Sequence, residues 1–257
     1  MIPATSPLLC SLFTRYAQKY VARGIHAVRV SHSGLPPQVP PGRPLVVYLN
    51  HPSWWDPMIG LILAARFWSG RRHFAPIDEV ALQKYRFLAR LGFFGIAKQG
   101  TRGGALFLRT SVAILQQPNT ALWITGEGDF CDPRVRPVAL RPGLGHLSRR
   151  VPQAVFVPLA LEYPFWQERI PEALCRFGTP LEPGAERATP SEWTARLQLA
   201  IQETQDALAV EAVRRRPGDF QTILVGKVGV GFFYDRWRAM KATRSGRCFD
   251  AAHGSEP

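Results

Sequence analysis

Short apolar runs alternate with longer amphipathic segments along most of the chain. The runs have strand length, whereas the segments between them repeat apolar residues at helical spacing. Strands that alternate with helices of this length predict a single α/β domain with a mostly parallel or mixed central sheet flanked by helices. The predicted strands are residues 44–50, 72–77, 92–98, 121–126, 154–163 and 173–178, and the predicted helices between the first four are residues 53–67, 79–90 and 103–117.

The clearest helix start in the sequence is Thr189-Pro190-Ser191-Glu192. A threonine followed three residues later by a glutamate forms a capping box, and proline is favoured at the first helical position. The helix that follows ends before Pro217 and carries one apolar face, made of Trp193, Leu197, Ile201 and Leu208.

Both ends of the chain are basic and aromatic. Residues 6–23 place apolar side chains at helical spacing with three basic residues between them, which predicts an amphipathic basic helix. That helix either docks on the core or lies in a lipid interface. Residues 225–247 have a similar composition and form either a second interfacial element or a surface helix. We therefore divide the chain into an N-terminal amphipathic segment 1–34, a domain 35–217, and a C-terminal segment and tail 218–257.

Composition narrows the range of partners. The chain has 257 residues, 46% of them hydrophobic, and a net charge of +13, which favours anionic partners such as anionic lipid, phosphorylated substrates or nucleic acid. Nucleic-acid binding rests on charge alone, because no zinc-ligand spacing or RNP-like aromatic run accompanies it, and we predict no nucleic-acid partner. The four cysteines lie far apart and form no CxxC pair, as expected for reduced thiols in a cytosolic protein.

Membrane association, if present, is expected to be peripheral. No apolar stretch reaches the length of about 18 residues that a spanning helix needs. The N-terminus also lacks the order of basic region, apolar run and small-residue cleavage site that marks a signal peptide. We therefore expect a peripheral protein on the cytoplasmic face of a membrane, without a transmembrane span.

The segment with the strongest chemical signal is Asn50-His51-Pro52-Ser53-Trp54-Trp55-Asp56. It lies between a predicted strand and a predicted helix, and ligand sites gather at the carboxyl ends of strands in α/β sheets. An aspartate in the first turn of the helix can reach back to the histidine and orient its imidazole, which then acts as a general base toward an alcohol. The alternative is structural: the histidine caps the helix and the aspartate stabilises its N-terminus.

A second histidine and aspartate with similar spacing, His73 and Asp78, provide a comparison. This pair spans a predicted strand, in which five residues cover about 16 Å, too far for a hydrogen bond. Only the strand–turn–helix arrangement of the first pair allows the two side chains to meet.

The first pair and its neighbours resemble the NHxSxxD motif of the glycerolipid acyltransferases, the PlsC-like lysophospholipid acyltransferase family. Three later blocks resemble the other motifs of that family in the same order, and the resemblance covers about residues 44–162. It implies a glycerol-3-phosphate-acyltransferase-like fold with amphipathic helices at both ends. The three blocks are GFFGIAK at 92–98, ITGEGD at 124–129 and VPL at 157–159.

The resemblance also implies an activity and a set of site residues. The activity is O-acyl transfer from acyl-CoA or acyl-ACP to the hydroxyl of a lyso-lipid or lipid alcohol at an anionic membrane surface, with no metal and no bound cofactor. His51 is the implied general base and Asp56 orients it. The implied substrate contacts come from Ser53, Lys98, Arg102, Glu127, Gly128 and Pro158.

The chain departs from the family pattern in the second and third motifs. Ala97 replaces the aspartate of the second motif, and Lys98 replaces its arginine, which removes the two-pronged contact suited to phosphate. The third motif lacks its arginine, and Asp129 adds a negative charge there. These departures disfavour the standard lysophosphatidate acceptor and favour a neutral alcohol or a lipid with another headgroup. They also leave open a second hypothesis, a non-catalytic lipid-binding protein that keeps the fold.

Aromatic residues near the motif have two interpretations each. Trp54 and Trp55 either line an acyl channel or pack a helix on the sheet. The run from Tyr163 to Trp166 forms either a lip of the acceptor site or a loop anchor. The chain contains no GxSxG sequence, which disfavours a covalent acyl-enzyme at a nucleophile elbow.

Overall fold

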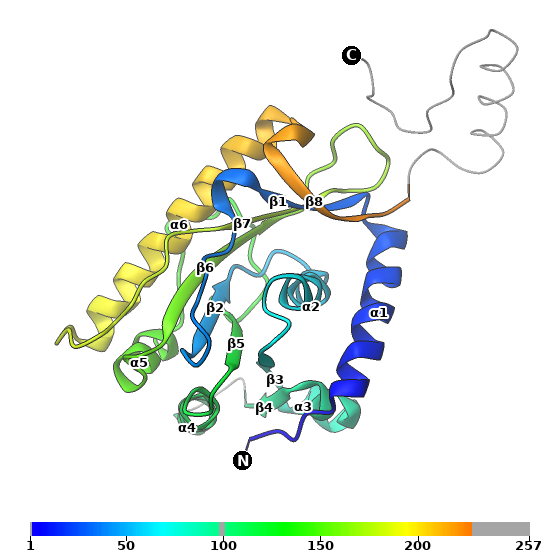
Figure 1. Ribbon diagram of the computed structural model, residues 1–257. Helices are drawn as coiled ribbons and strands as arrows, with labels where there is room; N and C mark the ends of the chain where they lie inside the picture. The colour runs from blue at the N-terminus through cyan, green and yellow to red at the C-terminus, as the bar shows by residue number, and fades with distance from the viewer. Residues whose placement is uncertain (1, 98–100, 228–257) are drawn as a thin grey trace, which may run out of the picture.

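One mixed sheet forms the centre of the protein, with strand order β4-β3-β5-β2-β6-β7-β1-β8 (Figure 1). The computed structural model describes residues 2–97 and 101–227. Within these residues the strands are β1 (Ala27–Ser31), β2 (Leu45–Leu49), β3 (Arg72–Asp78), β4 (Phe93–Ile96), β5 (Thr120–Thr125), β6 (Val155–Glu162), β7 (Ala173–Phe177) and β8 (Phe220–Val225).

Strand direction divides the sheet into two parts. The five neighbouring strands from β4 to β6 are parallel to one another, so their carboxyl ends meet at one edge. β7 is antiparallel to β6, β1 is parallel to β7, and β8 is antiparallel to β1. The expected α/β fold with a mixed central sheet is therefore confirmed. Two of its strands lie outside the range 35–217, since β1 precedes it and β8 follows it.

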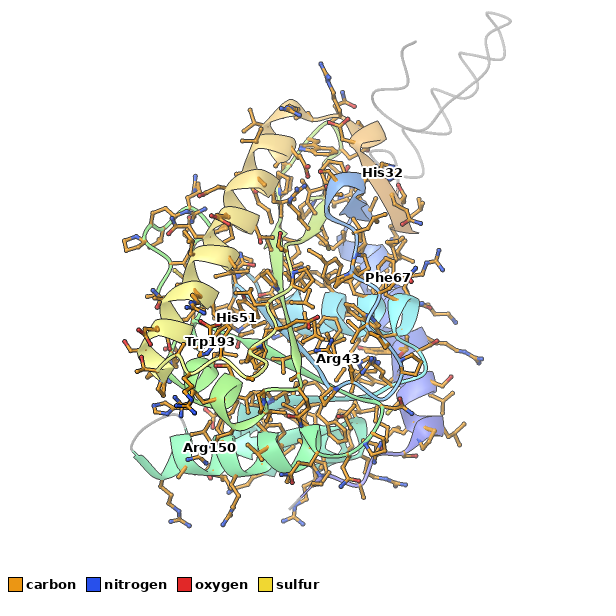
Figure 2. All side chains as sticks on the ribbon, turned by 60° about the vertical axis from the view of Figure 1, so that its left-hand side comes forward. His32, Arg43, His51, Phe67, Arg150 and Trp193 are labelled. Atoms are coloured by element: carbon orange, nitrogen blue, oxygen red, sulfur yellow. The ribbon has the colours of Figure 1, made fainter. Side chains whose placement is uncertain are left out.

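Helices cover both faces of the sheet, α1 and α2 on one face and α4, α5 and α6 on the other (Figure 1). Side chains fill the space on each side (Figure 2). The helices are α1 (Pro7–Gly24), α2 (Asp56–Phe67), α3 (Glu79–Lys84), α4 (Thr101–Leu115), α5 (Gly143–Arg150) and α6 (Pro190–Arg214), and 3-10 turns occupy His32–Gly34, Arg86–Leu91 and Pro217–Asp219.

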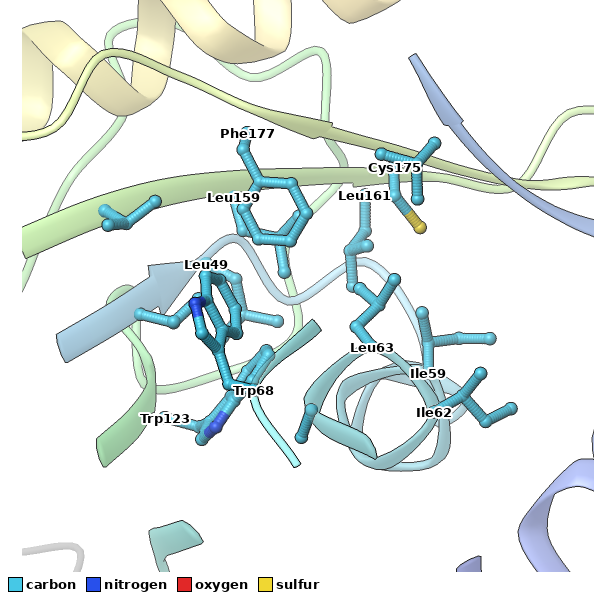
Figure 3. Packing of buried hydrophobic residues seen from close by; sticks show 14 of the residues in the cluster. Leu49, Ile59, Ile62, Leu63, Trp68, Trp123, Leu159, Leu161, Cys175 and Phe177 are labelled. Atoms are coloured by element: carbon cyan, nitrogen blue, oxygen red, sulfur yellow. The ribbon is translucent and has the colours of Figure 1, made fainter. Parts of the chain in front are cut away.

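The β2 strand shows how the two hydrophobic layers arise. Leu45, Val47 and Leu49 contribute to the layer under α2, whereas Val46 and Tyr48 contribute to the layer under α4, α5 and α6. Successive side chains of a strand point to opposite faces, so a strand buried on both faces is apolar throughout. Figure 3 shows side chains of α2 meeting those of β2, β6 and β7 in the first layer.

The predicted helix at 6–23 is present as α1, and its two faces have different surroundings. Ser6 caps it by accepting a hydrogen bond from the Leu9 N–H. Ala17 and Val21 are fully buried, whereas Leu8 and Leu12 are exposed. One face of α1 therefore docks on the core and another remains uncovered.

Three elements were absent from the sequence prediction: β1, β8 and α5. In β1 the charge of Arg29 interrupts the apolar run, and this arginine is buried because its Nε donates to Glu172, 143 residues away, over 3.0 Å. In α5 two glycines lower helix propensity. Gly145 is nevertheless required there, because a Cβ at this position would collide with α6 at Pro190 and Thr194.

Two further predictions need correction or lie outside the described residues. The helix predicted at 79–90 is two elements, since α3 ends at Lys84 and a 3-10 turn follows. The segment predicted at 225–247 lies outside the described residues beyond Lys227. Among the helices in the described ranges, none combines the length and apolar character needed to cross a membrane.

Candidate active site

The loop after β2 is fixed to β6 by a buried amide. The regular pairing of the two strands ends at Leu49 and Leu159. One residue later, Asn50 continues it with its side chain, which donates to the Leu161 carbonyl over 3.0 Å and accepts from the Leu161 N–H over 2.8 Å. Asn50 is 1% exposed, so its polar atoms need these partners. The position of the next residue, His51, is therefore set by the sheet.

His51 and Asp56 are in direct contact. The imidazole Nδ1 lies 2.7 Å from Asp56 Oδ2, and the same oxygen accepts the Ser53 N–H over 3.1 Å. The carboxylate is an acceptor, so we assign the imidazole proton to Nδ1. Nε2 is then the nitrogen with a lone pair, and it is the one able to take a proton from a substrate.

Tyr163 gives the carboxylate a third donor. Its hydroxyl lies 2.7 Å from Asp56 Oδ1, so both oxygens of Asp56 are hydrogen-bonded. Burial, followed by the charge of Asp56, raises the pKa of Tyr163 well above its ordinary value, and the hydroxyl remains a donor. The run from Tyr163 to Trp166 was expected to form either a lip of the acceptor site or a loop anchor. In the structure its first residue, Tyr163, contacts the histidine–aspartate pair itself.

The segment between β5 and α5, residues 126–142, covers the histidine; we refer to it as the covering loop. Glu127 Oε2 accepts the His51 N–H over 3.1 Å, and the Cys131 N–H donates to the His51 carbonyl over 3.0 Å. Gly128 has a φ of 82°, and a Cβ there would collide with the Arg141 side chain. Glu127 and Gly128 therefore hold the backbone of His51 and the turn that covers it.

Two residues of the covering loop, Phe130 and Cys131, contact His51. The Phe130 ring stacks on the His51 ring at a centroid distance of 4.2 Å, although Phe130 is 62% exposed overall. Burial and the neighbouring Glu127 carboxylate raise the pKa of the Cys131 thiol. Cys131 thus remains a protonated thiol, which is a poor nucleophile.

A small, mostly apolar cavity of about 100 Å³ lies beside Asp56, between α2 and the sheet. Trp54 and Trp55 do not line it; they contact Tyr20 of α1 instead. Its lining residues come from β2, α2, β3, the turn before β4, β4 and β5, and they are Leu49, Asp56, Pro57, Gly60, Leu61, Ala64, His73, Phe74, Ala75, Pro76, Leu91, Phe93, Trp123 and Thr125.

His73, at the wall of this cavity, is held as a neutral imidazole. Its Nδ1 accepts from Trp123 Nε1 over 3.1 Å, and its Nε2 lies 2.9 Å from the Trp68 carbonyl. Burial lowers the pKa of His73 to about 4. Asp78 accepts from the Val80 N–H at the start of α3. His73 and Asp78 therefore have separate partners, as the strand geometry predicts.

The remaining predicted substrate contacts are Ser53, Pro158, Arg102 and Lys98, and the first three lie in the described residues. Ser53 lies in the site, where its Oγ accepts from the Trp55 N–H. Pro158 does not: it alternates with Val157 and Leu159 along β6, so it faces α6, whereas the histidine–aspartate pair lies at the start of α2, the helix on the other face of the sheet. Arg102 is exposed in the first turn of α4, the helix that follows β4, and two strands, β3 and β5, separate β4 from β2. Lys98 lies outside the described residues.

Sequence reasoning did not assign Phe130 to the site, and it left Tyr163 open as part of either a lip of the acceptor site or a loop anchor. Tyr163 directly follows β6, the strand next to β2, and this position in the sequence favours a place beside His51. Nothing in the sequence marks Phe130 apart from its place after the Glu-Gly pair.

In the described ranges, no group of three or more histidine, cysteine, aspartate or glutamate side chains is arranged to hold a metal ion. Comparison of the chain with known protein families and with curated proteins found no match.

Replacing Tyr163 with phenylalanine tests its link to the histidine–aspartate pair. The carboxylate loses the donor on its Oδ1 and orients the imidazole less firmly. If the pair acts as a general base, we expect the rate per folded protein in the assay proposed below to fall by about tenfold or more. A purely structural role for Tyr163 would lower the free energy of unfolding, measured in urea, and leave the rate of the folded protein unchanged. The matched control is Tyr48→Phe, which removes a buried hydroxyl that donates to the Leu197 carbonyl, away from the pair.

The neutral state of His73 predicts a pH-dependent loss of stability. Its folded pKa lies below the unfolded value of 6.5, so protonation favours the unfolded chain as the pH falls. We expect His73 to remove on the order of 3 kcal/mol from the free energy of unfolding between pH 6.5 and 4. Urea unfolding at several pH values should show a smaller loss in His73→Gln than in wild type. His146→Gln, at an exposed histidine, should behave like wild type.

Proposed function

We propose that this protein is an O-acyltransferase that moves an acyl group from acyl-CoA or acyl-ACP to the hydroxyl of a lipid. The observation that carries the proposal is the 2.7 Å contact between His51 Nδ1 and a buried Asp56 carboxylate that has two further donors. A structural helix cap needs neither this contact nor a tyrosine on the other oxygen. An oriented imidazole with a free Nε2 suits proton abstraction.

The proposed reaction is a direct transfer. Nε2 of His51 takes the proton of the acceptor hydroxyl as the oxygen attacks the thioester carbonyl carbon. The tetrahedral intermediate collapses, the carbon–sulfur bond breaks, and the imidazolium returns the proton to the departing thiolate. Asp56 stabilises the imidazolium in between. The products are an ester and a free thiol.

Two features of the site support direct transfer to a lipid. Cys131, whose N–H donates to the His51 carbonyl, is kept protonated, which argues against an acyl-enzyme at this cysteine. The cavity beside Asp56 is small and lined mostly by apolar residues, which suits part of an alkyl chain. The ordered resemblance to the glycerolipid acyltransferase motifs and the mixed sheet agree with a glycerol-3-phosphate-acyltransferase-like fold, which is part of the proposal.

A surface suited to lipid lies next to the site. We call it the aromatic face: Leu8, Leu12, Tyr16, Trp54, Tyr85 and Phe87, all of them about half exposed or more. Rings connect it, since Phe13 contacts both Phe87 and Tyr16, and Tyr20 contacts both Tyr16 and Trp54. Exposed apolar groups of this size mark interaction sites, and tyrosine and tryptophan favour membrane–water interfaces. Exposed basic residues of α1 flank it: Arg15, Lys19 and Arg23. We propose that this face rests on anionic lipid.

Thiol release from an acyl thioester tests the catalytic proposal. With a panel of lyso-lipids and lipid alcohols, we expect His51→Gln to lower acceptor-dependent release by a factor of about 10² to 10⁴. Asp56→Asn should have an effect in the same direction. His146→Gln serves as the matched control. Equal release by wild type and His51→Gln with every acceptor would instead favour a non-catalytic lipid-binding protein.

Vesicle sedimentation tests the aromatic face. We expect binding to vesicles that contain phosphatidylglycerol, and weakening of that binding as salt screens the basic residues. The double variant Leu12→Ala/Trp54→Ala should bind less, because it removes exposed apolar side chains from the face. The control is Leu199→Ala/Val213→Ala, which removes side chains that are at least as exposed from α6 on the other side of the sheet. Equal loss in both double variants would contradict the assignment.

A further inference from the structure

Trp55 lies between α1 and the histidine–aspartate pair. Its ring packs against Tyr20 of α1 at a centroid distance of 5.5 Å, and its side chain also contacts the hydrophobic layer under α2. The two helices α1 and α2 pack against each other on that face of the sheet (Figure 1). Trp55 directly precedes Asp56, so the contact with α1 is made one residue away from the buried carboxylate.

Gly24, the last residue of α1, leaves room for this ring. A Cβ at position 24 would lie 2.7 Å from two carbons of the Trp55 ring, well inside the usual contact distance between carbon atoms. Gly24 does not have a positive φ, so its backbone conformation does not itself require glycine. The Trp55 ring therefore explains why glycine stands at the end of α1.

The backbone of Trp55 connects this packing to Asp56. Its N–H donates to Ser53 Oγ over 3.2 Å, and the Ser53 N–H donates to Asp56 Oδ2, the oxygen that also holds His51. Its carbonyl accepts the Ile59 N–H over 3.0 Å in the first turn of α2. A shift of Trp55 would therefore displace both the helix start that carries Asp56 and one donor of its carboxylate.

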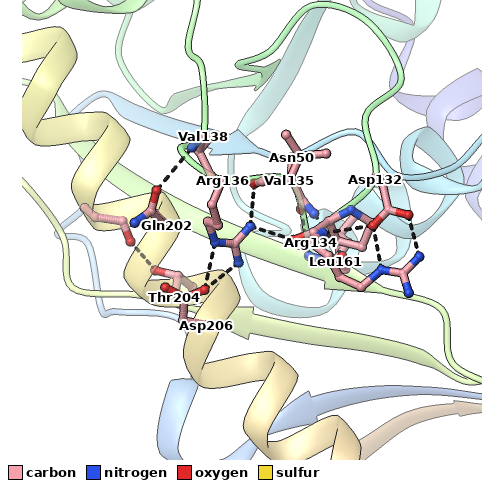
Figure 4. Close-up of polar contacts among 12 residues, drawn as sticks. Asn50, Asp132, Arg134, Val135, Arg136, Val138, Leu161, Gln202, Thr204 and Asp206 are labelled. Atoms are coloured by element: carbon pink, nitrogen blue, oxygen red, sulfur yellow. Dashed lines mark hydrogen bonds and ion pairs between the residues drawn. The ribbon is translucent and has the colours of Figure 1, made fainter.

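His51 itself is held by other elements. Asn50 fixes the preceding backbone to β6, and the covering loop is fixed to α6 by the bond from the Val138 N–H to Gln202 over 3.1 Å. Figure 4 shows Asn50 beside Leu161 and the contact of Val138 with Gln202. These contacts do not involve α1. The imidazole thus depends on the sheet and on α6, whereas the start of α2 depends on α1 as well.

We propose that Trp55 is a positioning residue for Asp56, and that α1 supports the histidine–aspartate pair through it. This inference rests on the acyl transfer proposed above and adds the docking of α1 to what that reaction needs. Proton transfer requires such support, because a displacement of about 1 Å can lower a rate by a factor of about 10². The docked face of α1 then serves the site, while its exposed residues belong to the aromatic face.

Gly24→Ala tests the inference, because it displaces the Trp55 ring without removing it. Alanine favours a helix more than glycine does, so α1 should stay folded. Acyl transfer is measured from acyl-CoA or acyl-ACP to monoacylglycerol or lysophosphatidate in neutral detergent micelles. We expect the rate at saturating acceptor to fall by about tenfold, with the KM for the acceptor little changed. The control, Gly104→Ala, changes a glycine of α4 with open space around it and should match wild type.

A second substitution tests whether the effect passes through Trp55. Phenylalanine lacks the outer edge of the tryptophan ring, so Trp55→Phe leaves room for a methyl group at position 24. Adding Gly24→Ala to Trp55→Phe should change the rate by no more than about twofold. Equal losses from Gly24→Ala with either side chain at position 55 would overturn the inference, because Gly24 would then act without Trp55.

The bond between the two side chains can also be observed without turnover. The His51 Nδ1 proton, held by a carboxylate oxygen 2.7 Å away, should give a proton resonance far downfield that is absent in His51→Gln. We expect this resonance to shift or disappear in Gly24→Ala and to persist in Gly104→Ala. A resonance that stays unchanged in Gly24→Ala would contradict the role assigned to Trp55.

The outcomes distinguish the two proposals. Activity that His51→Gln abolishes and Gly24→Ala leaves unchanged would overturn the inference, and so would a change in the KM alone; the acyltransferase proposal would stand in both cases. Absence of thiol release with both donors and every acceptor, under conditions in which wild type is folded, would overturn the acyl transfer. The Nδ1 resonance would then still decide whether Trp55 positions the pair.

Discussion

The buried carboxylate of Asp56 is the constraint on which the site depends. It is 1% exposed, and a carboxylate removed from water costs several kcal/mol unless hydrogen-bond donors replace that water. Its donors come from His51, from the backbone of Ser53 and from Tyr163 at the end of β6. The imidazole N–H is one of the donors that replace water at this carboxylate, and that hydrogen bond also orients the ring. The same contact therefore contributes both to the stability of the fold and to the geometry of the proposed base.

Strand order brings these partners together. β5, β2 and β6 are neighbours in the centre of the sheet and are parallel, so the segments that leave their carboxyl ends lie side by side. β2 continues into Asn50 and His51, β5 into the covering loop, and β6 into Tyr163. Asn50 extends the pairing of β2 with β6 by one residue beyond the backbone ladder, and so fixes the point from which His51 projects.

Charge and apolar surface are distributed unevenly, and the proposed function uses both. The excess of basic residues lies outside the covering loop, in which every arginine has a carboxylate partner. The exposed aromatic residues are connected ring to ring from the turn after α3, along α1, to Trp54, two residues before Asp56. The aromatic face, which we propose rests on anionic lipid, thus adjoins the proposed catalytic pair.

The sequence by itself determined the features that depend on local spacing. Continuous apolar runs of strand length predicted β2, β5 and β6, and the capping box predicted the start of α6. The strand–turn–helix junction predicted that His51 could meet Asp56 five residues later. Only the tertiary structure decided which distant segments meet. Tyr163 lies 107 residues from Asp56, and its role follows from the pairing of β2 with β6. Pro158 was expected in the site but faces α6, because one step along a strand reverses the face of the sheet. Strand β1 was missed because its buried arginine is neutralised by Glu172, a partner that no local pattern reveals. Local periodicity records which residues are buried, whereas the order of the strands decides which buried residues become neighbours.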